Sequence, residues 1–423
     1  MLSSPTRPAA LRLDSRVYLL GSAGLVRNVG RSATFVFLPI VFADLYHLPY
    51  LDIGLLIAAL VPVSTLAFLA GGYLSDRYGR RPFAIYPSFL SAAMLTLLWI
   101  DLGRGIPLVM LLWGINSLGG GLTRPSQSAM IGDVTPPHLS VTAFGVQRVF
   151  MNLGFAISPA VGGFLASTAG LPSLFLFAAI TSLIEGVVLL VLLRETFRGA
   201  KRTGATPTRL SEPFRDRPFV WLMIALAGLA LVMNQFGTPL ALFLGSVRDL
   251  PLTEFGLIYS LNGVLVVLLQ LPVSRLIERA PRYLGWMAGG TIAYGAGFLL
   301  FYAAGAFPLY LLAMAVLTLG EDVVSPTQQT LVATFGGRER RGSYFGSYNA
   351  VTNATRAIGP VVGTVLLGIG PLGPAYLWGG MAAAAVVVAG GFIALRVRTG
   401  RRRGPRDPTA PPPGAGEAML ADM

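Results

Sequence analysis

Long apolar runs separated by short polar segments dominate the chain. A helix needs about 20 mostly apolar residues to cross a hydrocarbon core of roughly 30 Å. Twelve runs meet this requirement, and we predict that they are transmembrane helices at residues 17–43, 51–74, 82–100, 106–131, 141–168, 172–194, 218–245, 254–277, 283–303, 307–333, 343–369 and 374–395. The predicted fold class is therefore an all-α integral membrane protein.

Two polar stretches interrupt this pattern. An Arg-rich segment separates the sixth run from the seventh, and the chain after residue 395 is rich in Arg and Pro. That last stretch has too little apolar surface to fold alone, so we expect it to be disordered. The predicted organisation is a cytoplasmic N-terminus at 1–16, a six-helix bundle at 17–194, a cytoplasmic linker at 195–217, a second six-helix bundle at 218–395 and a cytoplasmic tail at 396–423.

Composition supports lipid as the solvent of the chain. Of the 423 residues, 54% are hydrophobic and 12% are charged, whereas a soluble domain carries about 25% charged residues. The 51 glycines and 30 prolines fit membrane helices, which tolerate close packing and bends. The sequence has no cysteine, which excludes disulfides, thiolate catalysis and Cys-ligated metal sites. We expect no metal site.

The distribution of positive charge predicts the orientation. A formal net charge of +13 could suggest a nucleic-acid partner. With a cytoplasmic N-terminus, however, Arg104 and Arg248 are the only basic loop residues on the opposite side, as the positive-inside rule requires. We therefore expect a multi-pass protein of the inner (cytoplasmic) membrane with both termini cytoplasmic, and no nucleic-acid partner.

The two halves of the sequence repeat. Residues 48–54 match residues 250–256, and Asn152 corresponds to Asn353 once a single-residue shift is allowed. Six helices followed by six in the same orientation predict a duplicated bundle, with the solute path at the interface between the halves.

The segment between the second and third runs carries a family signature. It reads Gly-x-Leu-x-Asp-Arg-x-Gly-Arg-Arg, with Gly72, Leu74, Asp76, Arg77, Gly79, Arg80 and Arg81 at the defined positions. This resembles the signature loop of the major facilitator superfamily. The resemblance implies twelve helices in two pseudo-symmetric six-helix bundles and transport by alternating access. It also implies a small-molecule substrate, the proton gradient as driving force and no cofactor.

The same loop suggests a gate. We expect Gly72 to let a neighbouring helix approach closely and Gly79 to allow a tight turn. Asp76 should lie near the start of the eleventh helix, where the helix dipole favours a carboxylate by about 0.3–1 kcal/mol, so that it latches the cytoplasmic side. A degraded copy, with Glu278, Arg279 and Arg282, should face the fifth helix. Alternatively, these charges only anchor the loop at the lipid headgroups.

A second motif lies in the fifth run, at Gly154, Ser158, Pro159, Gly162 and Gly163. It resembles a motif of proton-coupled drug exporters in the superfamily, although it would equally serve as a packing seam that says nothing about direction. The Arg-x-x-Gln-Gly pattern typical of such exporters is missing from the fourth run, where Asn116 stands in place of the arginine. The usual proton route of those exporters is therefore in doubt.

Charged residues inside apolar runs are costly and mark function by default. Glu321 or Asp322 is the predicted proton-coupling group, because a desolvated carboxylate can exchange a proton near neutral pH, with Arg356 as counter-ion. A permanent buried ion pair is the alternative. Glu185 is expected to pack or to snorkel. Arg124 and Arg148 are expected to pair with Asp133 or Asp76. Candidates for the substrate cavity are Arg27, Asn28, Arg31, Asn116, Arg124, Gln328 and Asn353.

Several functions remain open at this point. The leading prediction is proton-coupled efflux, by antiport, of small drug-like or amphipathic compounds. An uptake or exchange carrier for an organic anion is the alternative, favoured by Arg27 and Arg31, and a non-transporting receptor or scaffold ranks lower. No enzyme motif is present, so we predict that the protein is not an enzyme. We expect a monomer whose partners are its substrate, protons and the bilayer.

Overall fold

The computed structural model describes residues 13–101, 103, 105–136, 139–196, 212–280, 282–336 and 341–401. Most of the predicted N-terminus, linker and tail lies outside these ranges. The first half consists of α1 (Ser15–Asp44), α2 (Tyr50–Tyr78), α3 (Arg80–Asp101), α4 (Ile106–Val134), α5 (Ser140–Ala169) and α6 (Ser173–Leu192). The second half consists of α7 (Arg217–Met233), α8 (Thr238–Leu242), α9 (Leu252–Arg279), α10 (Tyr283–Ala303), α11 (Phe307–Gly336), α12 (Arg341–Leu367) and α13 (Gly373–Arg401).

Twelve segments of the described chain are helical, long and apolar enough to cross a membrane, which confirms the predicted number of spans. No strand occurs in the described ranges. The last helix extends to Arg401, beyond the predicted boundary at residue 395. The start of the predicted tail is therefore helical.

The seventh span is interrupted, which the apolar run at 218–245 did not reveal. After α7 comes a 3-10 turn (Asn234–Phe236), then α8 and a π-helical turn (η4, Phe243–Val247). Gly237 leaves helical geometry with a ψ of −112°, and Pro239 cannot donate a backbone hydrogen bond. The Gln235 amide donates to the carbonyl oxygens of Leu231 (2.8 Å) and Gly359 (3.1 Å), and thereby ties this break to α12.

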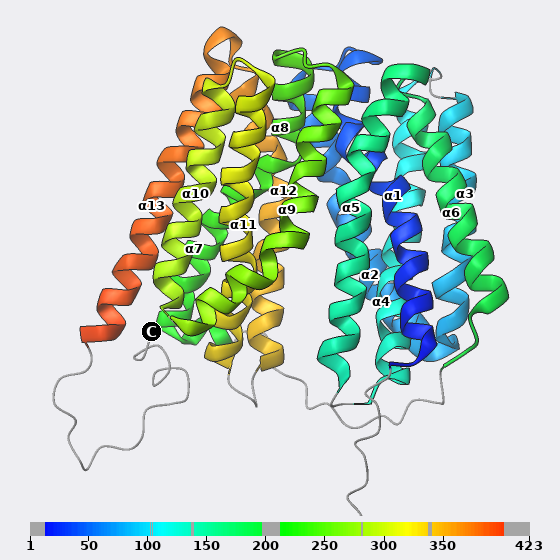
Figure 1. The fold of residues 1–423 in the computed structure, drawn as a ribbon, viewed down its shortest axis with the longest axis horizontal. Helices are drawn as coiled ribbons and strands as arrows, with labels where there is room; N and C mark the ends of the chain where they lie inside the picture. The colour runs from blue at the N-terminus through cyan, green and yellow to red at the C-terminus, as the bar shows by residue number, and fades with distance from the viewer. Residues whose placement is uncertain are drawn as a thin grey trace, which may run out of the picture.

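Figure 1 shows two bundles side by side, with α1 beginning and α13 ending at the same face of the molecule. We call this the terminal face and the other the opposite face. Between the bundles α5 packs against α9, and α2 against α12. Exchanging the halves converts one of these contacts into the other, because the fifth span corresponds to the eleventh and the second to the eighth. The contacts thus follow the predicted duplication.

The halves meet closely toward the opposite face. A Cβ added at Gly163 or Gly256 would collide with the backbone of the other half, at Leu252 and Pro159 respectively. The Ala160 amide donates to Ser260 Oγ at 2.8 Å across the same seam. Small residues thus allow two helices from different halves to approach to backbone contact.

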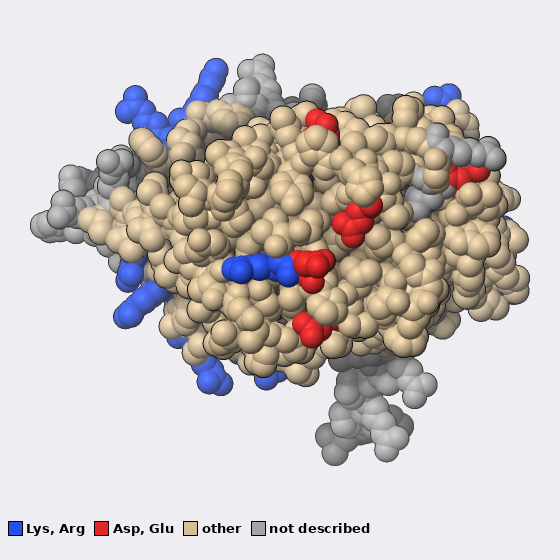
Figure 2. Space-filling model, turned by 90° about the horizontal axis from the view of Figure 1, so that it is seen from above, with Lys and Arg blue, Asp and Glu red and all other residues tan. Residues whose placement is uncertain are grey.

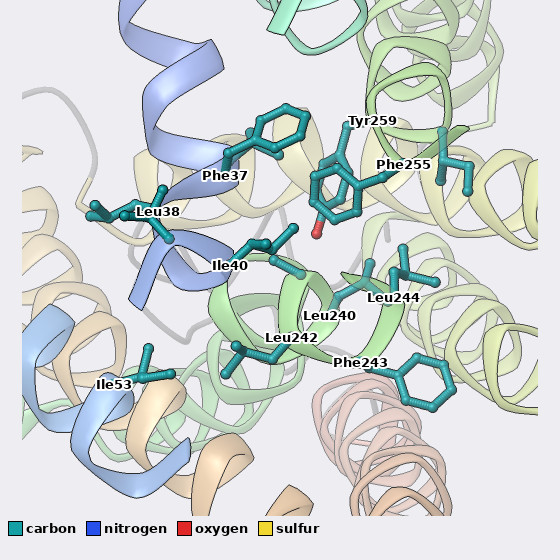
Figure 3. Packing of buried hydrophobic residues seen from close by; sticks show 14 of the residues in the cluster. Phe37, Leu38, Ile40, Ile53, Leu240, Leu242, Phe243, Leu244, Phe255 and Tyr259 are labelled. Atoms are coloured by element: carbon teal, nitrogen blue, oxygen red, sulfur yellow. The ribbon is translucent and has the colours of Figure 1, made fainter. Parts of the chain in front are cut away.

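An apolar seal closes this side (Figure 3). The rings of Phe37 in α1 and Phe255 in α9 lie 4.8 Å apart, edge to face, and Tyr259 lies 4.9 Å from Phe255. Ile40 packs against the segment around Gly245. All four side chains are buried, at 1% exposure or less. Because they come from both halves, they would have to separate for a path to open at the opposite face.

The opposite face carries little positive charge, as Figure 2 shows, with acidic groups over its centre and basic groups mostly at the rim. The described acids at the helix ends on this face are Asp44, Asp52, Asp101, Asp249 and Glu254. This distribution agrees with the charge asymmetry in the sequence.

Candidate transport site

The signature loop is an ion-paired turn at the terminal face. Arg80 forms ion pairs with Asp133 in α4 and, at 3.4 Å, with Asp76. Glu195 accepts hydrogen bonds from the backbone amides of Arg80 (3.4 Å) and Arg81 (3.0 Å). The loop therefore ties α2 and α3 to α4 and to the end of α6, all within the first half.

The predicted latch is not made in this conformation. Asp76 pairs within its own half, and its side chain is 61% exposed. In Figure 1 the bundles converge at the opposite face and separate toward the terminal face. An open latch is what the prediction requires for a conformation that opens on this side. The latched state itself stays a prediction.

Two glycines of the signature behave differently. Gly79 has a φ of +96°, which suits glycine and confirms the predicted tight turn. Gly72, in contrast, has no heavy atom within 4 Å of the position of an added Cβ, so the expected close approach at Gly72 is wrong for this conformation. Its neighbour Gly71 makes that approach: a Cβ there would lie 2.8 Å from Leu122 Cα. The helix presents Gly71, one position earlier, to α4.

The degraded copy of the loop makes no ion pair among the described residues. Glu278 and Arg279, in the last turn of α9, and Arg282, just beyond it, are all exposed. Residue 281 and the side chain of Val141 lie outside what the structure describes, so the expected facing of this copy and α5 stays a prediction.

The motif in α5 packs on both sides. Gly154 and Gly162 face α1, where a Cβ would lie 3.0 Å from Asn28 Cβ and from Ala33 Cβ, respectively. Ser158 Oγ donates to the backbone oxygen of Val29. Gly163 faces α9 of the other half. The motif therefore joins its own bundle to the other one, which fits the packing interpretation and leaves the transport direction open.

A buried polar cluster holds four helices of the first half together. Glu185 in α6 is fully buried and accepts hydrogen bonds from Ser88 in α3 (3.0 Å) and Gln127 in α4 (3.1 Å). Arg27 in α1 lies 3.5 Å from the same carboxylate and donates to Gln127 Oε1 at 3.4 Å. Snorkelling of Glu185 to the membrane surface is therefore wrong, because its carboxylate is enclosed and paired.

A cavity of about 290 Å³ lies between the halves at mid-depth. Glu321 lies on its wall and accepts a hydrogen bond from the Asn262 amide at 2.9 Å. The other lining residues are Asn152, Phe155, Phe236, Gly263 and Val266. The space thus combines a carboxylate, amides and aromatic rings drawn from both halves, as is typical of small-molecule sites.

The side chain of Asp322, next to Glu321, has no hydrogen-bond partner among the described residues. Its side chain is fully buried, and neither carboxylate oxygen has a hydrogen-bond partner. The expected ion pair with Arg356 is absent from the described contacts, and Arg356 is exposed. A permanent pair between the tenth and eleventh spans is therefore wrong for this conformation. An ionised carboxylate in such surroundings is costly.

Arginines from three helices converge on the same interior. The positive charges of Arg27, Arg31, Arg124 and Arg356 are near enough to repel one another. Arg31 has accessible surface although it lies in the middle of α1. Within the described chain, Arg31, Arg124 and Arg356 make no ion pair or hydrogen bond.

Other predicted site residues divide into two groups. Asn28 donates to the Met151 carbonyl at 2.8 Å, and so joins α1 to α5. Asn116, Gln328 and Asn353 are partly exposed and have no side-chain hydrogen bond within the described part.

The expected pairing of Arg124 or Arg148 with Asp133 or Asp76 is wrong. Arg80 forms ion pairs with both acids, and Arg148 donates to Gln270 of the other half at 3.2 Å.

Several site residues escaped sequence reasoning. Ser88, Asn262 and Gln270 are neutral polar residues within apolar runs, and each contacts an acid or arginine of the interior. In the sequence, each could have been noticed as an isolated amide or hydroxyl within a membrane-spanning segment. Such residues also occur at ordinary helix–helix contacts, so this feature alone does not identify a site.

These features define an integral membrane transporter, built as two bundles around a polar cavity at mid-depth. Comparison with family models agrees: the model of the Major Facilitator Superfamily matches residues 20–358 and 248–420. The chain belongs to the Major Facilitator Superfamily.

Similar proteins include bacterial transporters. An uncharacterized MFS-type transporter, YttB of Bacillus subtilis (strain 168), is 26% identical and covers 74% of this chain and 79% of its own length. A Na(+), Li(+), K(+)/H(+) antiporter of Planococcus maritimus is 25% identical, over 77% of this chain and 84% of its own length. The quinolone resistance protein NorA of Staphylococcus aureus (strain MSSA476) is 23% identical (83% and 89%).

Solved structures share the fold. A peptide transporter POT in complex with sulfate superposes with a TM-score of 0.75 at 16% identity, covering 94% of this chain and 97% of the other. A mutant of the nucleoside transporter NupG gives a TM-score of 0.72 at 17% identity, with 90% and 99% coverage. Likeness at this level of identity concerns the fold alone.

Proposed function

We propose that this transporter exports small amphipathic compounds from the cytoplasm in exchange for protons, with both termini cytoplasmic. The observation that carries the proposal is Asp322, an acid buried beside the cavity wall with no partner for either oxygen. An unpaired charge is unfavourable there, whereas a protonated carboxyl is tolerated. A change of conformation that hydrates Asp322 or gives it a counter-ion would release the proton.

Glu321 places substrate and proton in the same space. It lies on the cavity wall, held by Asn262, and it adjoins Asp322 in the chain. A solute in the cavity therefore competes with water and protons for Glu321, and the enclosed Asp322 is the next residue of the same helix. Such competition is the physical basis of antiport, because the two ligands stabilise different states.

The names of two relatives agree with this proposal. One is called a cation/proton antiporter and the other a quinolone resistance protein, at 25% and 23% identity. Uptake or exchange of an organic anion is a second candidate, favoured by the unpaired arginines of the interior. The direction of flux separates the two.

The test is flux in proteoliposomes with an imposed pH gradient or sodium gradient, for a panel of amphipathic dyes. Asp322→Asn should abolish flux driven by the pH gradient while the protein stays folded. Asp52→Asn, which neutralises an exposed acid in the first turn of α2, is the matched control and should leave flux unchanged. Full pH-driven flux in Asp322→Asn, or flux driven by sodium alone, would contradict proton coupling through this residue.

A further inference from the structure

Three arginines of the interior lack partners. Arg31 in α1, Arg124 in α4 and Arg356 in α12 are all exposed, although each lies well inside a membrane-spanning helix. None of them has an ion pair or hydrogen bond among the described residues. We call them the three-arginine site. Arginines within a membrane are ordinarily paired or face an aqueous space that serves a function.

The fourth arginine, in contrast, is ion-paired. Arg27, one helical turn before Arg31, is 16% exposed and paired with the fully buried Glu185. The Glu185 carboxylate therefore already has a cationic partner. Glu185 also attracts Arg31, but it is already paired with Arg27, and no acid of the described chain forms an ion pair with Arg31, Arg124 or Arg356. A complementary group from outside the chain would offset the repulsion that remains among the arginines.

An apolar wall lies beside the arginines. Phe35 follows Arg31 by one turn of α1 and therefore shares its helix face. Phe35 lines a small pocket together with Phe155 and Phe236, and these two rings also line the cavity that contains Glu321. A guanidinium group is thus followed, toward the opposite face, by an aromatic surface.

We infer that the three-arginine site binds the carboxylate or sulfonate of an amphipathic solute whose aromatic body lies against Phe35, Phe155 and Phe236. Guanidinium groups suit planar oxyanions because they donate parallel hydrogen bonds. This inference rests on the proposed function and names its substrate class.

The site also joins the halves. Arg356 belongs to the second bundle and the other two to the first. An empty site sets like charges against each other across the seam and favours separation at the terminal face. A bound oxyanion offsets this repulsion and favours closure, so that occupancy by the solute itself lowers the barrier to alternating access.

The experiment measures binding rather than transport. The full chain, purified in a non-ionic detergent, is titrated by calorimetry with 2-naphthoate and with 2-naphthamide, which has the same shape and no charge. Naphthoate should bind, more weakly at high salt, and naphthamide should bind at least about tenfold more weakly. Equal affinity for the two probes would overturn the inference.

Variants assign the contact to residues. Arg31→Gln, Arg124→Gln and Arg356→Gln should each weaken naphthoate binding by about tenfold, the effect of one charge-assisted hydrogen bond. Arg356→Lys, which keeps the charge, should retain part of the affinity if the variant is folded. Arg275→Gln, at an exposed position near the end of α9, is the matched control. If Arg275→Gln loses as much naphthoate affinity as the variants of the three arginines, the affinity depends only on the net charge of the protein, and the inference is overturned.

Two further measurements distinguish a lipid from a solute as the occupant, and binding from coupling. Phosphatidylglycerol that displaces naphthoate stoichiometrically would identify the occupant as a lipid headgroup and overturn the assignment to a solute. Asp322→Asn should keep naphthoate binding. If the unmodified protein binds naphthoate but shows no pH-driven flux, proton coupling is refuted and the oxyanion site stands. If it shows pH-driven flux but does not bind naphthoate, only the oxyanion site is refuted.

Discussion

Two buried acids, Glu185 in the first half and Asp322 in the second, are both inaccessible to solvent but have opposite surroundings. Glu185 has a hydroxyl at 3.0 Å, an amide at 3.1 Å and a guanidinium at 3.5 Å. Asp322 has no hydrogen-bond partner for either oxygen. Burial alone therefore does not assign a role to an acid within a membrane. Partners place one acid in an ion pair within its bundle, and their absence is why we propose the other as the group that exchanges a proton.

The largest expected effect is on the partnered acid. Arg27→Met should destabilise the first bundle by about 3–5 kcal/mol, because it leaves the buried carboxylate of Glu185 without its counter-ion. The double variant Arg27→Met with Glu185→Met should recover most of this loss, since well-packed apolar side chains replace a buried pair at little cost. Unfolding in detergent, followed by circular dichroism, measures both. A single variant as stable as the unmodified protein would show that the pair contributes nothing.

The unpartnered acid should respond in the opposite way. Asp322→Asn removes a group that is costly when charged, so the free energy of unfolding should stay the same or rise by about 1 kcal/mol, while pH-driven flux is lost. The same denaturation experiment checks this. A loss of stability comparable with that of Arg27→Met would place Asp322 in a structural network and end the contrast between the two acids.

The amides beside the acids sharpen the comparison further. Gln127→Leu removes a donor from Glu185 and should cost about 1–3 kcal/mol of stability. Asn262→Leu removes the donor that holds Glu321 and should chiefly shift the pH dependence of flux. The sign follows from the chemistry: a donor stabilises the ionised carboxylate, so its loss should move the profile toward higher pH. No shift would remove Glu321 from the coupling step.

The smallest effect is expected at the loop of the terminal face. Asp76 is 61% exposed and pairs only within its own half, so Asp76→Asn should change stability by less than about 1 kcal/mol. It should slow turnover if the carboxylate latches α12 in the other conformation. A spin-label distance across the terminal face that is identical with and without the substitution would speak against the latch.

The sequence predicted the fold well because hydropathy and charge asymmetry are properties of single segments. The twelve spans and the turn at Gly79 follow from such local rules. The break in the seventh span was missed although Gly237 and Pro239 mark it, because the run is apolar on average despite Asn234, Gln235 and Thr238. Gly72 was preferred over Gly71 from the motif alone, and only packing shows which one faces α4.

The site was harder to predict because its contacts join residues far apart in the chain. Glu185 and Asp322 look alike in sequence, each an acid in an apolar run. The partners of Glu185 come from α1, α3 and α4, and no periodicity within α6 could identify them. Likewise, Arg356 was paired with an acid by proximity in the predicted bundle, whereas the structure directs it toward other arginines.

Infrared difference spectroscopy between acidic and alkaline buffer can show whether Asp322 carries the exchanged proton, because a protonated carboxyl has its own C=O band in a region free of amide absorption. In the unmodified protein, a band from a carboxyl in apolar surroundings should disappear on alkalinisation. Asp322→Asn should lack this band, whereas Asp52→Asn should keep it. A band that Asp322→Asn leaves unchanged would show that another group carries the proton.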